Sequence, residues 1–176
     1  MTDGGYTTLY HIVGCNHGIQ IGSGGFADLD GADANEHREH FRALIEDIRG
    51  EGAIQIFLEE DGTLEETAAQ QIALEQGVSW ENINTTNEDK DQMGIPRDYL
   101  SGAYSDDQKH GWNRQRDVFM VGKIAKHRSK FEHAIVICGF DHFEPIAALL
   151  EAKGIPVRRW DYRATGWFRP GVLADG

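Results

Sequence analysis

Long apolar runs, cysteine and basic residues are all scarce in this chain of 176 residues. No run of 18 or more apolar residues occurs, so the sequence predicts no membrane-spanning helix. Residues 1–10 contain neither a basic start nor the apolar core of a signal peptide. The two cysteines, Cys15 and Cys138, are too few for a disulfide framework and suit a reducing compartment. We therefore expect a cytoplasmic protein that does not bind membranes.

The charge balance is strongly acidic. Seventeen Lys and Arg residues stand against 29 Asp and Glu residues, which gives a formal net charge of −12. Such a surface repels nucleic acid and anionic lipid, so neither is an expected partner. The candidate site described below implies a small-molecule or peptide substrate as the partner. Homo-oligomerisation is left open. With 40% hydrophobic residues, the length suits one domain with a single core over residues 1–176, with residues 161–176 as a tail.

Strand and helix signals alternate along the chain. This alternation predicts an α/β fold with three layers, in which helices cover both faces of a mainly parallel sheet. A capping box of Thr63 and Glu66 begins a helix that ends at Gly77, and Pro145 is expected in the first turn of a later helix. The expected strands are 9–13, 53–58, 78–83, 134–138 and 155–160, and the other expected helices cover 41–50 and 107–128.

Residues 84–110 form the longest polar stretch between these elements. The stretch has one proline and two glycines before His110 and shows no strand-like alternation. A connection of this length predicts an excursion or a lid over a binding site rather than a tight loop.

Two apolar runs end in the same pattern, Gly-x-x-His. The first run leads into Gly14 and His17, and the second leads into Gly139 and His142. If both runs are neighbouring parallel strands, each glycine allows a sharp turn and each histidine reaches the same edge of the sheet. A lone histidine at a strand end is usually structural, but two histidines in matching local sequence predict a site.

Carboxylates and an arginine complete the candidate site. Glu59 and Glu60 follow the second strand, and Arg116 lies among the apolar positions of the 107–128 helix. Imidazole and carboxylate ligands without thiolate suit a divalent ion such as Mn, Co, Fe or Zn in an open site. We expect His17, His142 and one glutamate to bind the metal, the other glutamate to activate water, and Arg116 to stabilise an oxyanion. Adjacent strand residues point to opposite faces, so one of the two glutamates enters the pocket directly, and which one is left open.

The order of these motifs resembles the superfamily of TraB, GumN, Tiki proteases, ChaN and erythromycin esterases. The resemblance rests on both Gly-x-x-His motifs, the glutamate pair, the stretch 115–120 with Arg116, and the helical segment 146–150. It implies an α/β fold with one pocket and, by analogy with the Tiki-like members, a metal-dependent peptidase or esterase. Other members imply the alternatives, which are a metal-independent esterase-like hydrolase and a non-catalytic module that binds haem or another small ligand.

Two further interpretations concern residues within the motifs. Cys15 and Cys138 are expected to be small buried residues rather than nucleophiles or ligands. Asn16 and Asp141 suit a turn, with orientation of the histidines as the alternative interpretation.

Overall fold

The computed structural model describes residues 7–15, 34–62 and 66–161. Its centre is a sheet with the strand order β3-β2-β4-β1-β5, in which every pair of neighbours is parallel. This arrangement confirms the expected α/β class. The strands are β1 (Leu9–Cys15), β2 (Ile54–Glu59), β3 (Ser79–Asn82), β4 (His133–Gly139) and β5 (Val157–Asp161).

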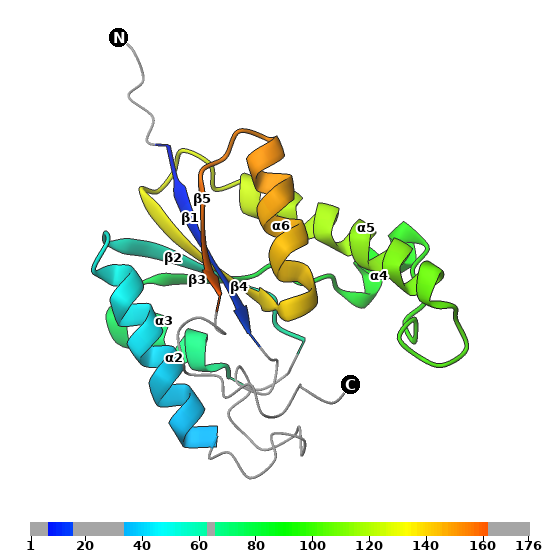
Figure 1. Cartoon of the computed structure of the whole chain (residues 1–176), viewed down its shortest axis with the longest axis horizontal. Helices are drawn as coiled ribbons and strands as arrows, with labels where there is room; N and C mark the ends of the chain where they lie inside the picture. Colours follow the sequence, from blue (N-terminus) through cyan, green and yellow to red (C-terminus); the bar gives the residue numbers. More distant parts are fainter. Residues whose placement is uncertain (1–6, 16–33, 63–65, 162–176) are drawn as a thin grey trace.

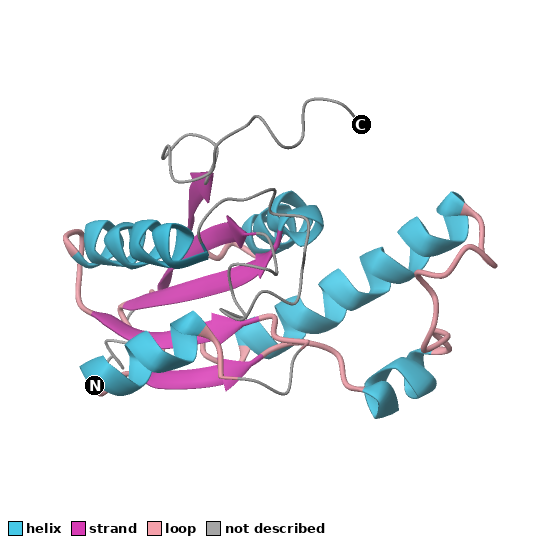
Figure 2. Cartoon of the chain, turned by 90° about the horizontal axis from the view of Figure 1, so that it is seen from below, coloured by secondary structure: helices cyan, strands magenta, loops and turns pink. Residues whose placement is uncertain are grey.

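Helices cover both faces of the sheet and give the expected three layers (Figures 1 and 2). On one face, α2 (Ala34–Arg49) and α3 (Ala68–Gln76) pack against inward residues such as Val13 and Phe57. On the other face, α5 (Asp106–Ala125) and α6 (Phe140–Ala152) pack against residues such as Ile12 and Leu58. Each central strand therefore buries side chains on both faces, as its nearly continuous apolar sequence predicts. Within the described ranges, no helix has the length and apolar character needed to cross a bilayer.

The start of α3 differs from the prediction. Its capping box is formed by Thr67, whose side chain accepts from the backbone N–H of Gln70, while the Gln70 side chain accepts from the N–H of Thr67. Thr63 lies outside the described residues. The predicted end is confirmed, because Gly77 is the C-cap with φ of 65°.

Residues 84–110 contain more regular structure than a plain excursion. They include α4 (Asn87–Met93), which begins at a capping box of Thr86 and Asp89 and ends at Gly94 with φ of 69°. They also include the first turn of α5. Figure 2 shows α4 and the amino-terminal half of α5 projecting beyond the sheet as one arm. Polar composition concealed these helices, because capped exposed helices lack an apolar stripe.

The described parts of the two Gly-x-x-His motifs, Gly14–Cys15 and Gly139–His142, lie at the same edge of the sheet, whereas His17 lies outside the described residues. β1 and β4 are parallel neighbours, with Cys15 paired to Gly139. The chain leaves β1 towards β2 by way of α2 on one face, and it leaves β4 towards β5 by way of α6 on the other. Two adjacent strands whose connections diverge to opposite faces form a topological switch point, where ligands bind in open α/β sheets.

The role expected for the motif glycines is wrong. Gly14 lies inside β1, and Gly139 has φ of −57°, which any residue can adopt. Gly14 is needed instead for close packing of α6 on β1, since a Cβ there would lie 3.0 Å from the ring of Phe143. The position of Pro145 also differs from the prediction, because α6 begins at Phe140 and places the proline in its second turn.

Candidate functional site

Four buried side chains from three elements meet beside the carboxyl end of β4. Glu60 directly follows β2, Arg116 and Asp117 are neighbours on α5, and His142 lies in the first turn of α6. Each is at most 7% exposed. The structure thus brings together three of the five predicted site residues, which are Glu60, Arg116 and His142. The fourth, Glu59, lies elsewhere, and the fifth, His17, lies outside the described residues.

His142 is held by Asp117. The distance from Nδ1 of His142 to Oδ1 of Asp117 is 2.5 Å. A carboxylate only accepts hydrogen bonds, so the proton lies on Nδ1 when the imidazole is neutral. Nε2 then carries the lone pair and accepts from Nη1 of Arg116, 3.1 Å away. Asp117 therefore fixes both the tautomer and the orientation of the ring.

Glu60 links the arginine to the start of α6. Its Oε1 lies 2.7 Å from Nη2 of Arg116 and 3.4 Å from Nε2 of His142. Its Oε2 accepts from the backbone N–H of Gly139 at 2.9 Å. Gly139 is the N-cap of α6 and provides no side-chain cap, so the Glu60 carboxylate meets the positive end of the helix dipole.

Arg116 uses all five of its N–H donors. Nη1 donates to His142 and to the hydroxyl of Tyr99, at 3.1 and 2.5 Å, and Nη2 donates to Glu60 and to Oδ1 of Asn84, at 2.7 and 3.0 Å. Nε donates to Oγ1 of Thr85 at 3.1 Å. A guanidinium with no spare donor is held rigidly, and any new acceptor must replace one of these partners.

Glu59 points to the opposite face of the sheet. Its Oε2 accepts from the hydroxyl of Thr67 at 2.6 Å and from the indole N–H of Trp80 at 2.7 Å. These partners lie on the α3 side, away from Arg116. The structure thus answers which of the two glutamates meets Arg116 and His142: it is Glu60.

A groove between α5 and α6 reaches Asp117 of this network. It has a volume of about 690 Å³ and mixes polar and apolar lining residues, among them Asn113, Asp117, Asp141 and Leu149. Asp141 is exposed in the groove, whereas the carboxylate that holds His142 is Asp117. Asp117 therefore has the orienting role that was considered for Asp141.

The arrangement of these four residues does not suit a metal ion as it stands. Among the described residues, no group of three or more His, Cys, Asp and Glu side chains could bind one. The two atoms best placed as ligands, Nε2 of His142 and Oε1 of Glu60, both accept from the guanidinium of Arg116. A cation between them would have to displace a positive charge, so metal binding requires Arg116 to move.

The two cysteines are buried, as predicted. Cys15 and Cys138 are at most 1% exposed and belong to the clusters on opposite faces of the sheet. Burial raises the pKa of both thiols well above the ordinary value, with a smaller contribution from nearby glutamates. Neither thiol is therefore primed as a nucleophile at neutral pH.

Sequence reasoning missed four partners of the network, namely Asn84, Thr85, Tyr99 and Asp117. Three of these lie in the 84–110 segment, where polar composition alone does not single out individual residues. Asp117 was predictable from the neighbouring sequence, because the helical spacing that places Arg116 among apolar residues also brings the next residue close to that face. Comparison with protein-family models, curated proteins and solved structures finds no significant match to this chain.

Proposed function

We propose that this chain is a hydrolase of ester or peptide bonds in which His142 is the general base and no metal is required. The observation that supports this proposal is the hydrogen bond from Nδ1 of His142 to Asp117, which leaves Nε2 basic and directed at a buried guanidinium. This combination supplies a proton acceptor and a donor for a developing oxyanion within one site. It corresponds to the metal-independent, erythromycin-esterase-like form of the TraB and Tiki resemblance.

The chemistry follows from the shared N–H of Arg116. When a substrate carbonyl enters, its oxygen replaces Nε2 of His142 as the acceptor at Nη1. Nε2 is then free to take a proton from water, whose oxygen attacks the carbonyl carbon. The oxyanion forms beside the guanidinium, and Asp117 stabilises the imidazolium. As the tetrahedral intermediate collapses, the leaving alkoxide or amine takes the proton from Nε2, so the site returns to its starting state.

Glu60 acts as a positioning residue in this scheme. Its two oxygens are directed at Arg116 and at the backbone of Gly139. It therefore fixes the guanidinium relative to the first turn of α6, which carries His142. Tyr99 and Asn84 hold the same guanidinium from the side of the arm.

Metal-dependent hydrolysis is the second candidate. The observation that favours it is again the Asp117–His142 pair, because metal-binding histidines commonly donate their other ring N–H to a carboxylate. His142 and Glu60 would hold the ion once Arg116 moved away, and the ion would lower the pKa of bound water. His17 is the third proposed ligand.

A hydrolysis panel distinguishes the two candidates. Aryl esters and short peptides are offered to the full chain in the presence and absence of EDTA, together with His142→Ala and the control His127→Ala, a histidine just beyond α5 that pairs with Glu81 away from the groove. We expect hydrolysis that resists EDTA and falls about 10²- to 10⁴-fold in His142→Ala but not in His127→Ala. Loss with EDTA and recovery with added metal would select the second candidate. Absence of hydrolysis in every condition contradicts both.

A further inference from the structure

Helix α5 has an exposed face opposite the one that carries Arg116 and Asp117. Six exposed residues share it at spacings of three and four: Asp107, Gly111, Gln115, Val118, Gly122 and Lys126. We call this set the α5 stripe. Val118 at its centre is 55% exposed. Residues at these spacings form one continuous ridge on a helix, and helices pack against one another through such ridges.

Packing within residues 7–15, 34–62 and 66–161 does not explain the two glycines of the stripe. A Cβ added to Gly111 or to Gly122 would meet nothing within 4 Å, and neither residue has positive φ. Glycine inside a helix is unfavourable unless something approaches the backbone closely. The packing of the described residues therefore does not require either glycine, whereas a second helix lying on the stripe would.

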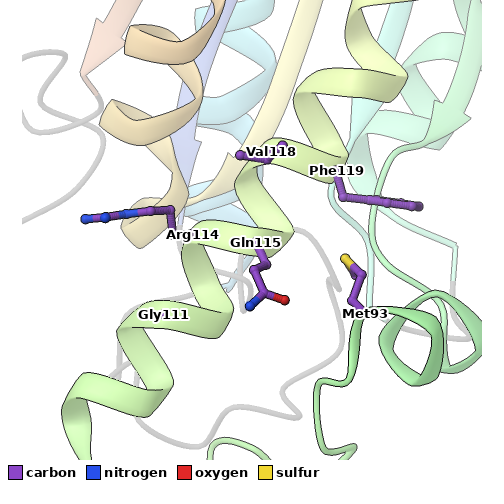
Figure 3. Close-up of a pocket in the computed structure, with 6 residues that line it drawn as sticks. All are labelled: Met93, Gly111, Arg114, Gln115, Val118 and Phe119. Atoms are coloured by element: carbon purple, nitrogen blue, oxygen red, sulfur yellow. The ribbon is translucent and has the colours of Figure 1, made fainter.

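An apolar hollow adjoins the stripe. Its volume is about 620 Å³, and it is lined by Gly111, Gln115 and Val118 of the stripe, by Arg114 and Phe119 beside them, and by Met93 at the end of α4. Figure 3 shows Met93 and the side chain of Phe119 on the same side of α5, with Gly111 lower on the helix than Gln115 and Phe119. The missing side chain of Gly111 leaves room for an apolar side chain from a partner.

We propose that the α5 stripe is a self-association surface on which a second copy of this chain places its own α5 in antiparallel orientation. The positions match under twofold symmetry. When Gln115 of one copy lies level with Val118 of the other, Gly111, four residues earlier, lies level with Gly122, four residues later. Both pairs of glycines then allow close approach of the backbones, and Val118 of each copy meets the hollow of the other.

Charge complementarity supports the antiparallel orientation. The first turn of α5 is acidic, with Asp106 and Asp107, and its last turn is basic, with Lys123 followed by Lys126. In an antiparallel pair, the acidic turn of each copy faces the basic turn of the other at both ends. A parallel pair would bring like charges together.

This proposal does not rest on the proposed function, because the stripe lies on the face of α5 opposite the buried residues Arg116 and Asp117. The test is sedimentation velocity of the full chain from low to high micromolar concentration. We expect a reversible monomer–dimer equilibrium, weakened at least about tenfold by Val118→Asp, which places a charge in the apolar seam. The matched control is Leu74→Asp on α3, where the leucine is 76% exposed, and it leaves association unchanged.

A charge exchange tests the orientation. Asp107→Lys and Lys126→Asp should each weaken the dimer, because each brings like charges together, and the double variant should restore it. Three results would overturn the proposal: a wild-type chain that stays monomeric throughout, Val118→Asp that associates like wild type, and a double exchange that does not recover. Association alone decides this proposal, so it stands or falls whether or not the variants hydrolyse esters or peptides.

Discussion

Replacing Arg116 by leucine removes the positive charge at the centre of the buried network. Its side chain is 9% exposed and that of Glu60 is 1% exposed, so the substitution leaves a carboxylate deep in the protein without its cation. The N–H of Gly139 still reaches Oε2, but a hydrogen bond does not replace the lost charge. Breaking a buried ion pair from one side costs about 3 to 5 kcal/mol. This is a large share of the roughly 5 to 15 kcal/mol that stabilises a typical domain.

The exposed pair Arg97 and Asp91 provides the matched control. Its nearest atoms lie 2.5 Å apart, yet the two side chains are 60% and 52% exposed. Arg97→Leu should therefore cost much less than Arg116→Leu, since water screens the pair and solvates the remaining charge.

Urea unfolding followed by circular dichroism measures both losses as shifts of the midpoint at constant slope. Adding Glu60→Gln to Arg116→Leu removes the stranded charge, so we expect the double variant to lose less than the sum of the two single variants. If Arg116→Leu costs no more than Arg97→Leu, the network is not the stabilising, pre-formed unit described above.

Three further predictions concern separate parts of the molecule. Burial lowers the pKa of His11 from 6.5 to about 4, with smaller contributions from neighbouring cations, so the unfolded chain binds more protons between these pH values. Stability should fall by up to about 3 kcal/mol as the pH drops from 6.5 to 4, and the loss seen in urea titrations should shrink in His11→Gln. Gly52→Ala should lower the free energy of unfolding by about 1 to 3 kcal/mol, because the new Cβ would lie 2.2 Å from the ring of His133. Gly102→Ala, whose Cβ would lie in open space, should leave the free energy of unfolding nearly unchanged in the same titration. Asp117→Asn should lower kcat of the proposed hydrolysis by roughly 10²- to 10⁴-fold through the wrong tautomer of His142, with a folded circular dichroism spectrum, and unchanged kcat would remove Asp117 from the mechanism.

The architecture was predictable because it depends on local patterns. The apolar runs before the two Gly-x-x-His motifs became neighbouring parallel strands, and helical spacing of Phe41, Leu44, Ile45 and Ile48 marked α2. Such patterns survive in a single sequence because burial repeats with the period of the element.

The side-chain network was harder to predict. It depends on which face of a strand each residue occupies and on contacts between residues that are far apart in the sequence. β2 buries residues on both faces, so no alternation of polar and apolar residues showed whether Glu59 or Glu60 faces α5. The role of Gly14 depends on Phe143, which is far along the chain, and the support for Arg116 comes from residues placed by α4. Nothing in local composition encodes these contacts.

The tautomer of His142 tests the central claim most directly. Nitrogen-15 NMR of the imidazole, assigned by the loss of its signals in His142→Gln, reports which ring nitrogen carries the proton. The account predicts a protonated Nδ1 with a low-field proton, as expected for a short hydrogen bond to Asp117, and an unprotonated Nε2. A neutral ring with its proton on Nε2 would contradict the account, because that nitrogen could then take no proton from water.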